Sequence, residues 1–239
     1  MTEPHVRLPE GTAPALDARE PPLGPLVATD VCYHRAGRTL LDHVSFLASP
    51  GQVTAVTGPS GSGKSSLLAL LGGLERPDAG TVHRHPPTAR LGFVLQAYGL
   101  ANLLTAAENI EIALQPRLAA GRLTRADIRR NTADMLERVG LSRNADHLVE
   151  ELSGGQQQRV AIARALIAEP DILLADEFAA ELDHTAKQQA LELILAVARR
   201  GGIVVIATHD PDIAERCHQV LHLTDGHLHP LGRGDLCQF

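Results

Sequence analysis

The chain has 239 residues, 44% of them hydrophobic, which is enough to bury the core of one large domain or of a core with a smaller appendage. Its formal net charge is −6, which argues against the broad basic surface that nucleic-acid binding usually requires, so we expect no nucleic-acid partner. The longest apolar run, residues 67–74, contains two glycines and is far shorter than the roughly 20 residues that span a bilayer.

The first 26 residues carry six prolines and few large apolar side chains, a composition that disfavours helix and strand. We therefore interpret residues 1–26 as a disordered leader. Because the chain starts acidic and proline-rich, without a basic segment followed by an apolar stretch, we see no secretory signal and expect a cytoplasmic protein. Order is predicted from Val27 onward, with β-type runs at residues 40–47 and 53–57.

Residues 58–65 read Gly-Pro-Ser-Gly-Ser-Gly-Lys-Ser and stand between the β-type run 53–57 and a helical pattern at 64–74. Such a loop can turn its backbone N–H groups inward, and the helix adds its positive end, so the loop can hold phosphate. We expect Lys64, one of only two lysines, to reach the β- and γ-phosphates of a nucleotide and Ser65 to ligate Mg²⁺. A glycine-rich turn that matches by chance is the alternative, which the flanking strand and helix disfavour. The predicted phosphate-binding residues are Gly58, Pro59, Ser60, Gly61, Ser62, Gly63, Lys64, Ser65 and Ser66.

Further β-type runs surround Thr81 and residues 91–95, and helical patterns follow at 105–114 and 124–139. A second loop motif, with Leu152 followed by Ser153, Gly154, Gly155 and Gln156, opens a predicted helix at 156–168. Its backbone N–H groups at a positive helix end can bind a γ-phosphate, yet the chain's own loop already surrounds the nucleotide. The simplest geometry pairs two chains head to tail with two nucleotides between them. The alternative is an ordinary N-cap serine followed by flexible glycines.

An apolar run at residues 172–175 ends in Asp176 and Glu177. Adjacent carboxylates at the tip of a buried strand are costly unless a cation or a water needs them. Asp176 is suited to hold Mg²⁺ and Glu177 to polarise the water that attacks the γ-phosphate, although acids can also simply end a strand at the surface. A helix at 184–200 and an apolar strand at 203–207 follow, and this alternation predicts a parallel sheet that is buried on both faces.

Together, the motifs at 58–65 and 152–156 resemble those of ABC transporter ATP-binding subunits, over about residues 27–229. Residues 60–68, 72–77 and 107–110 resemble the lipoprotein-release and macrolide-export type more closely. The chain departs from the family pattern at Phe178-Ala179, where Pro-Thr is usual, and at Glu181, where a small residue is usual. The stretch at 80–91 is also shorter than in that subfamily.

The resemblance implies roles for four further residues. Tyr33 matches the aromatic that stacks on adenine, although it can also be an ordinary strand aromatic. Gln96 matches the glutamine that contacts Mg²⁺ and the attacking water, and His209 the switch histidine that bonds the γ-phosphate; an exposed glutamine and a lone histidine are the plainer alternatives. Asp183 matches the loop that crosses the dimer interface and can equally cap the helix that follows.

The resemblance also implies an α/β fold: a P-loop NTPase core with a parallel sheet, an N-terminal antiparallel β subdomain and an inserted α-helical subdomain. We expect the core at residues 27–96 and 155–239 and the helical subdomain at 97–154. Cys32, Cys217 and Cys237 lack the spacing of a metal motif, so we expect them to be reduced and structural.

The implied activity is ATP hydrolysis with Mg²⁺ in a dimer formed with a second ATPase subunit, identical or paralogous. That dimer would drive a membrane-spanning transporter subunit, which would hold this chain on the inner face of the cell membrane. A soluble ABC-type ATPase and an ATP-dependent regulatory scaffold are the alternatives. The sequence defines neither the transported substrate nor the direction of transport.

Overall fold

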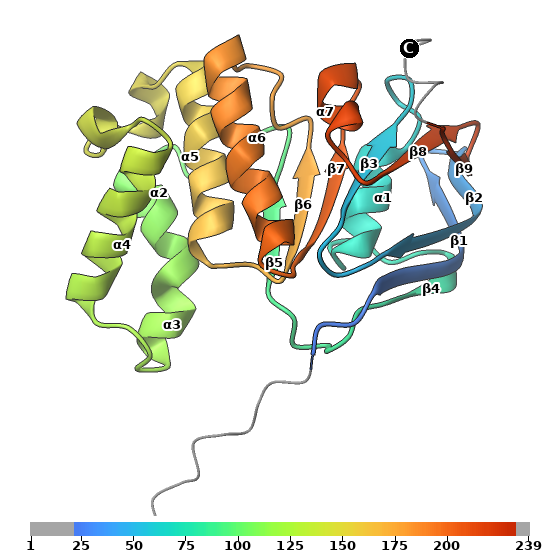
Figure 1. Cartoon of the computed structure of the whole chain (residues 1–239), viewed down its shortest axis with the longest axis horizontal. Helices are drawn as coiled ribbons and strands as arrows, with labels where there is room; N and C mark the ends of the chain where they lie inside the picture. The colour runs from blue at the N-terminus through green and yellow to red at the C-terminus, as the bar shows by residue number, and fades with distance from the viewer. Residues whose placement is uncertain (1–21, 233–239) are drawn as a thin grey trace, which may run out of the picture.

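The computed structural model describes residues 22–232, so nearly all of the predicted leader lies outside the described residues. A six-stranded sheet forms the centre, in the order β5-β6-β7-β3-β8-β9 (Figure 1). The first five strands are parallel, and β9 pairs antiparallel with β8. Their bounds are β5 Leu91–Val94, β6 Ile172–Asp176, β7 Ile203–Ala207, β3 Val53–Thr57, β8 Gln219–Thr224 and β9 His227–Pro230.

A second sheet, entirely antiparallel, has the order β2-β1-β4, with β1 at Leu26–Arg35, β2 at Arg38–Ala48 and β4 at Ala79–His83. Helix α1, Lys64–Leu71, lies between the two sheets (Figure 1). Its leucines pack with Leu41 and Phe46 of the antiparallel sheet and with Ile172 and Leu174 of the parallel sheet in one buried cluster. The apolar residues of α1 therefore join the two sheets.

The opposite face of the parallel sheet is covered by helices in a second buried cluster. Leu173 and Ala175 of β6 point to this face while their neighbours point to the other, as strand alternation requires. The helices are α2 Ala106–Glu111, α3 Gln115–Ala119, α4 Arg125–Arg138, α5 Gly154–Ile167, α6 His184–Arg199 and α7 Pro211–Glu215. Short 3₁₀ segments lie at Ile112–Leu114, Ser142–Asn144 and Val149–Glu151.

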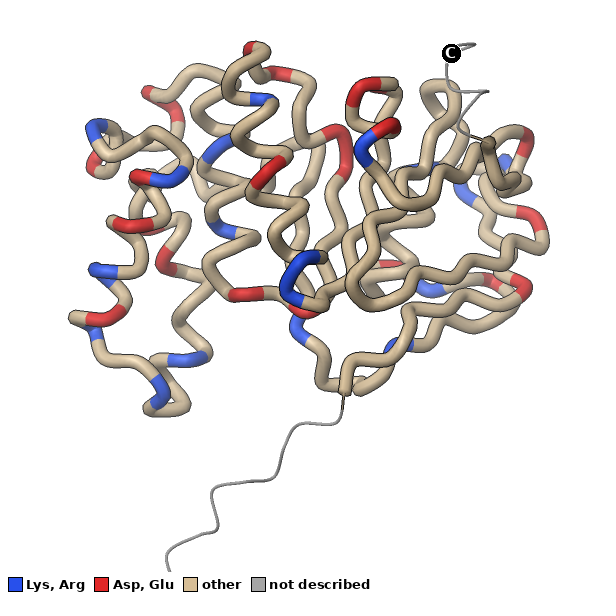
Figure 2. Tube along the Cα trace, viewed as in Figure 1, with Lys and Arg blue, Asp and Glu red and all other residues tan. Residues whose placement is uncertain are grey.

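Helices α2 and α4 begin where the sequence supplies capping boxes. The side chains of Thr105 and Thr124 each accept a hydrogen bond from the backbone N–H of the residue three positions later. The carboxylates of those later residues, Glu108 and Asp127, accept in turn from the backbone N–H of the threonine. Along α4, arginines alternate with acids on the outer surface (Figure 2). Within residues 22–232, every helix is too short or too polar to cross a membrane.

The predicted fold class is confirmed, but the sequence analysis did not identify β8, β9 and α7. Strands β8 and β9 form a hairpin around Asp225 and Gly226, which both have positive φ, at 48° and 81°. Asp-Gly between two β-type runs is a strong hairpin signal, so this turn was readable from the sequence. The predicted helix at 156–168 in fact begins at Gly154, because Ser153 caps it.

The loop that leads into α2 is held by one buried amide, that of Asn109, whose exposed fraction is 0%. Its Oδ1 accepts a hydrogen bond from the backbone N–H of Ala101 at 2.8 Å. Its Nδ2 lies 3.0–3.3 Å from the carbonyl oxygens of Leu104 and Thr105 and 3.1 Å from that of Ala101. One side chain thus satisfies backbone groups that would otherwise be unpaired inside the protein.

We expect Asn109→Ala to lower the free energy of unfolding by about 2–4 kcal/mol, because it leaves buried backbone groups without partners. Denaturant unfolding monitored by circular dichroism measures the change. Asn131→Ala on α4, at a half-buried asparagine, is the matched control and should stay within about 0.5 kcal/mol of the parent. Equal losses in the two variants would contradict this role.

Candidate functional site

Residues 58–63 form a tight loop between β3 and α1, and two of its glycines are required by their surroundings. Gly58 has φ 142°, and a Cβ added there would lie 2.2 Å from the carbonyl oxygen of Leu223. Gly63 has φ 104°, and its Cβ would lie 2.9 Å from the carbonyl oxygen of Leu40. The loop therefore passes so close to β8 and β2 that any side chain at these positions would displace backbone.

Lys64 begins α1, and its side chain folds back over this loop. It is 8% exposed, and its Nζ donates to the carbonyl oxygens of Gly58 at 2.8 Å and Pro59 at 3.0 Å. An ammonium has three donors, so these two bonds leave one for an incoming phosphate oxygen. The hydroxyl of Ser62 is buried without a hydrogen-bond partner within residues 22–232, as is expected of a loop built to hold an anion.

Asp176 ends β6 beside Ser65, and its carboxylate is only partly satisfied. It is 8% exposed, and its Oδ1 is buried without a hydrogen-bond partner within the described residues. Burial raises the pKa of Asp176, and the charge of Glu177 adds to this, while the Ser65 hydroxyl and the Lys64 ammonium oppose it. A cation beside this oxygen would remove the cost of burying the charge.

Ser65 and Asp176 are the two polar residues that line a cavity of about 30 Å³, whose other walls are apolar side chains. A hydroxyl and a carboxylate are the oxygen ligands that Mg²⁺ prefers, and Mg²⁺ usually takes only one or two protein ligands beside substrate phosphates. The residues present therefore fit the predicted Mg²⁺ site.

Glu177 and His209 lie side by side at the ends of β6 and β7. The Nδ1 atom of His209 is 3.0 Å from the Glu177 carboxylate. Glu177 has φ 47° and is 13% exposed, while His209 is 73% exposed and can reach a ligand. The pairing of β6 with β7 places Asp176 opposite Ala207, so the residues after both strands meet at one edge of the sheet.

A partly buried ion pair holds the segment that carries His209. The Nζ atom of Lys187, on α6, lies 2.8 Å from Oδ2 of Asp210. The hydrogen bond to Asp210 raises the pKa of Lys187. Asp210 also accepts from the backbone N–H of Asp212 at 2.9 Å and caps α7. Sequence reasoning missed this brace, because nothing in the spacing of residues 187 and 210 indicates contact.

A larger cavity, of about 630 Å³, connects the phosphate loop to the His209 segment. Its walls include Gly58 and Pro59 on one side, His209 and Asp210 on another, and His222 of β8. The start of the loop at 58–63 and the His209 segment therefore border one space, while Lys64, Ser65 and Asp176 lie outside its lining.

Gln96 follows β5 and is exposed. Because β5 pairs with β6 in parallel, Gln96 lies at the same edge of the sheet as Asp176 and Glu177. The turn after it is attached to α5: the guanidinium of Arg164 donates to the carbonyl oxygens of Tyr98 at 2.8 Å and of Gly99. The contact of Gln96 with Mg²⁺ and water stays a prediction.

Tyr33 lies on β1 and is half-buried. Its hydroxyl donates a short hydrogen bond to the carboxylate of Glu75, which follows α1, and Arg35 lies 3.1 Å from the same carboxylate. The bond to Glu75, with burial, raises the pKa of Tyr33. The hydroxyl is thus held in place, and adenine stacking by the ring stays a prediction.

The second loop motif sits at the start of α5. Ser153 is exposed and caps the helix, and its backbone N–H donates to Oε1 of Gln156 at 2.8 Å. Within residues 22–232, no hydrogen bond joins this motif to the phosphate loop at 58–66. Ser153 is therefore an N-cap, as the alternative interpretation of this motif expected. This role is compatible with the predicted contact of the motif with a nucleotide on a second chain.

The segment after Glu177 packs against that motif. A Cβ added to Gly155 would lie 2.7 Å from the carbonyl oxygen of Glu181, so only glycine fits there. Phe178, where the family usually has proline, is fully buried in the helical-face core and anchors this segment. Asp183 accepts from the Ala186 N–H at 2.8 Å and caps α6, while its role at a dimer interface stays a prediction.

Comparison with known proteins agrees with this geometry. The profile of the ABC transporter family matches residues 41–180. The lipoprotein-releasing system ATP-binding protein LolD 1 of Rhodopirellula baltica is 39% identical over 218 residues, which cover 84% of this chain and 93% of that protein. The macrolide export ATP-binding/permease protein MacB 2 of Yersinia pestis bv. Antiqua is 37% identical over 203 residues, which cover 79% of this chain and 29% of that protein.

Among solved structures, the chain is similar to the ATP-binding cassette MJ0796 in a dimeric, post-hydrolysis state bound to ADP and Pi. The TM-score is 0.78 with 30% sequence identity, and the match covers 87% of this chain and 98% of that one. The arrangement of the two sheets and the helical layer is therefore shared with a cassette known to bind nucleotide.

We expect Asp176→Asn to stabilise the nucleotide-free protein at pH 7 by on the order of 1 kcal/mol, because it removes a buried, partly unsatisfied charge. Since the folded-state pKa of Asp176 is raised, this cost is absent well below the ordinary carboxyl pKa and grows as the pH rises through the raised value. Thermal unfolding between pH 4 and pH 8 measures it.

Asp171→Asn, at the residue before β6, is the matched control with the opposite sign. Burial works to raise the pKa of Asp171, but its hydrogen bonds and charge contact with Arg90 outweigh this and lower it. We expect this variant to lose about 1–2 kcal/mol at pH 7. A loss of stability in both variants would contradict the account of Asp176.

Proposed function

We propose that this chain, which belongs to the ABC transporter family, is an ATP-hydrolysing subunit that powers a membrane-spanning partner. The resemblance predicted from the motifs is confirmed by the family match and by the similarity to LolD 1. One observation carries the catalytic part of the proposal: the unsatisfied Asp176 carboxylate, Ser65, Glu177 and His209 gather at one sheet edge beside the phosphate loop.

In this proposal the loop at 58–66 binds the ATP phosphates through backbone N–H groups and through Lys64. Ser65 and Asp176 hold Mg²⁺, with Gln96 contributing from the end of β5. When bound, Mg²⁺ would offset the negative charge of the triphosphate. Tyr33 supports the adenine ring from β1. The buried hydroxyl of Ser62 and the buried Oδ1 of Asp176 support this assignment, because both lack partners within the described residues.

Glu177 is the proposed general base, and it polarises the water that attacks the γ-phosphate in line. The His209 contact supports this role, because it fixes the carboxylate at the γ-phosphate end of the site. His209 donates to the γ-phosphate when ATP is bound, and Lys187 holds the segment that presents it. Asp183 lies on the segment between Glu177 and α6, and in this proposal that segment faces the second chain.

The proposed active unit is a head-to-tail dimer of two ATPase subunits, identical or paralogous. Ser153, Gly154, Gly155 and Gln156 of each chain bind the γ-phosphate held by the other chain. The similar cassette MJ0796 is dimeric with ADP and Pi, which supports this arrangement. ATP favours the closed dimer and hydrolysis releases it, because a ligand shifts only an equilibrium whose states it distinguishes.

The proposed partner is a membrane-spanning transporter subunit, and the chain is held on the inner face of the membrane through it. LolD 1 belongs to a lipoprotein-releasing system, and MacB 2 is a combined ATP-binding and permease protein, which supports this proposal. Exposed leucines are available for such a contact in the segment between β5 and α2: Leu103 is 88% exposed and Leu95 is 38% exposed. Motion of this region would pass the hydrolytic cycle to the partner.

We expect Glu177→Gln to slow ATP hydrolysis by about 10²–10⁴-fold while ATP binding is kept, because the amide cannot act as a base. Phosphate release and equilibrium binding of a fluorescent ATP analogue measure the two properties. Glu215→Gln, at an exposed glutamate of α7, is the control and should leave both unchanged. Parent protein that binds ATP and releases no phosphate, even with its membrane partner, would favour the regulatory scaffold instead.

We expect Leu103→Ser to weaken coupling to the membrane partner without altering basal hydrolysis, since this side chain is almost fully exposed and is none of the proposed site residues. The readout is the stimulation of phosphate release by the reconstituted partner, which should fall at least threefold. Leu47→Ser on β2, at a leucine that is 53% exposed, is the matched control. Equal stimulation in the Leu103 variant and the parent would place the contact elsewhere.

A further inference from the structure

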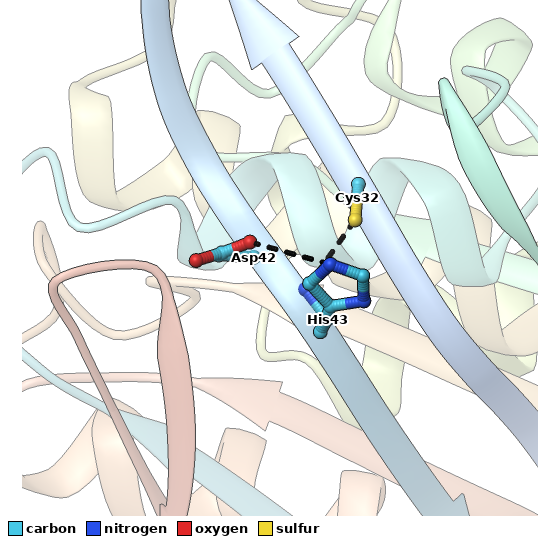
Figure 3. Close-up of side chains that lie close together, drawn as sticks. All are labelled: Cys32, Asp42 and His43. Carbon is cyan, nitrogen blue, oxygen red and sulfur yellow. Dashed lines mark hydrogen bonds and ion pairs between the residues drawn. The ribbon is translucent and has the colours of Figure 1, made fainter.

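We propose that the antiparallel sheet carries a Zn²⁺ site formed by Cys32 of β1 and by Asp42 and His43 of β2 (Figure 3). One donor atom from each residue, the thiol sulfur, a carboxylate oxygen and an imidazole nitrogen, lies within 4.8 Å of the other two. Zn²⁺ is bound in proteins by these three kinds of atom. The site is separate from the phosphate loop, and it was not predicted from the sequence, where the cysteines lack metal-motif spacing.

An irregularity in strand pairing creates this cluster. Between β1 and β2 the register shifts so that Asp42 and His43 together lie opposite Cys32. In a regular strand, consecutive side chains point to opposite faces. His43 instead has φ 51°, which breaks the alternation and brings its ring to the side of Asp42. Positive φ costs conformational free energy in a residue other than glycine, and such conformations concentrate at functional sites.

A neighbouring carboxylate orients the histidine as a metal ligand. Oδ1 of Asp30 lies 2.7 Å from Nδ1 of His43. With the proton of Nδ1 directed to Asp30, the lone pair of Nε2 is free, and Nε2 lies 4.0 Å from Oδ1 of Asp42. A carboxylate behind a histidine is the usual outer contact of zinc-binding histidines. Asp30 also has positive φ, at 54°, and lies at a second register shift of β1.

The other two ligands are also supported from outside the cluster. The backbone N–H of His43 donates to Sγ of Cys32 at 3.4 Å, which holds the sulfur on the side of His43. Nε2 of His227, on β9, lies 3.8 Å from Oδ2 of Asp42, and Nδ1 lies 3.2 Å from the Asp42 carbonyl oxygen. The contacts with His227 thus hold Oδ2 of the Asp42 carboxylate, while the other carboxylate oxygen, Oδ1, faces His43.

The types of ligand atom in this cluster determine which metal ion the site prefers. Three protein ligands leave the fourth tetrahedral position to water. A thiolate and an imidazole favour Zn²⁺ over Mg²⁺, which prefers oxygen ligands only. The cluster is partly exposed, since Cys32 is half-buried and the His43 side chain is 68% exposed, so a metal ion can enter from solvent.

The test is a Zn²⁺ titration of the reduced, metal-free full chain in competition with a chromophoric chelator. We expect one equivalent of Zn²⁺ to bind and millimolar Mg²⁺ not to displace it. Co²⁺ used as a probe should give the thiolate charge-transfer absorption of a cysteine ligand. Cys32→Ser and His43→Gln should each weaken Zn²⁺ binding at least tenfold, and Cys32→Ser should remove the Co²⁺ absorption. Asp30→Asn should weaken binding about 10–100-fold, as loss of an outer contact does.

Two variants are matched controls. His34→Ala removes an exposed histidine of the same strand, which pairs with Asp78 at 3.0 Å, and Cys237→Ser removes a thiol outside the described residues. Both should bind Zn²⁺ like the parent. Thermal unfolding of each variant without metal shows whether it is folded. Absence of saturable Zn²⁺ binding by the parent, or equal binding by folded His43→Gln and parent, would overturn the site and leave an ordinary surface ion pair.

Discussion

Parallel pairing of three buried strands is the constraint on which the site depends. Val56 of β3 lies opposite Ala207 of β7, and Ala207 lies opposite Asp176 of β6. The backbone continues this pairing beyond the strands, because the Glu177 N–H donates to the Ala207 carbonyl oxygen at 2.9 Å and the Thr208 N–H to that of Val56 at 3.1 Å. The phosphate loop, the two acids and His209 therefore leave the sheet at one level, whatever the chemistry of their side chains.

The fold class, and the need for glycine at two positions of the loop at 58–63, have local causes that can be seen in the sequence. Glycines at 58 and 63 are demanded by close backbone approach, and wholly apolar strands by burial on both faces. The roles of the site residues, and the division into residues 27–96, 155–239 and 97–154, stay predictions. What the structure adds to them is position: Glu177 beside His209, and an unsatisfied oxygen on Asp176.

What could not be predicted depends on pairing between distant segments. The brace between Lys187 and Asp210 forms only because α6 and the end of β7 pack together. The cluster at Cys32 depends on two residues of β2 facing one of β1, and a shift of one residue in strand register reverses the face to which every side chain points. The role of Phe178 likewise could not be predicted from the motif, because it depends on the core in which this side chain is fully buried.

Both lysines of the chain are held by oxygen partners: Nζ of Lys64 donates to the carbonyl oxygens of Gly58 and Pro59, and Nζ of Lys187 donates to Oδ2 of Asp210. The remaining positive side chains are arginines, whose guanidinium groups do not react with amine-directed reagents. Acylation of lysine in this protein, whether by a chemical label or by an acetyltransferase, is consequently confined to two side chains, both of which already hold hydrogen-bond partners. An amine-directed label therefore gives a pattern of side-chain modification that is simple to interpret.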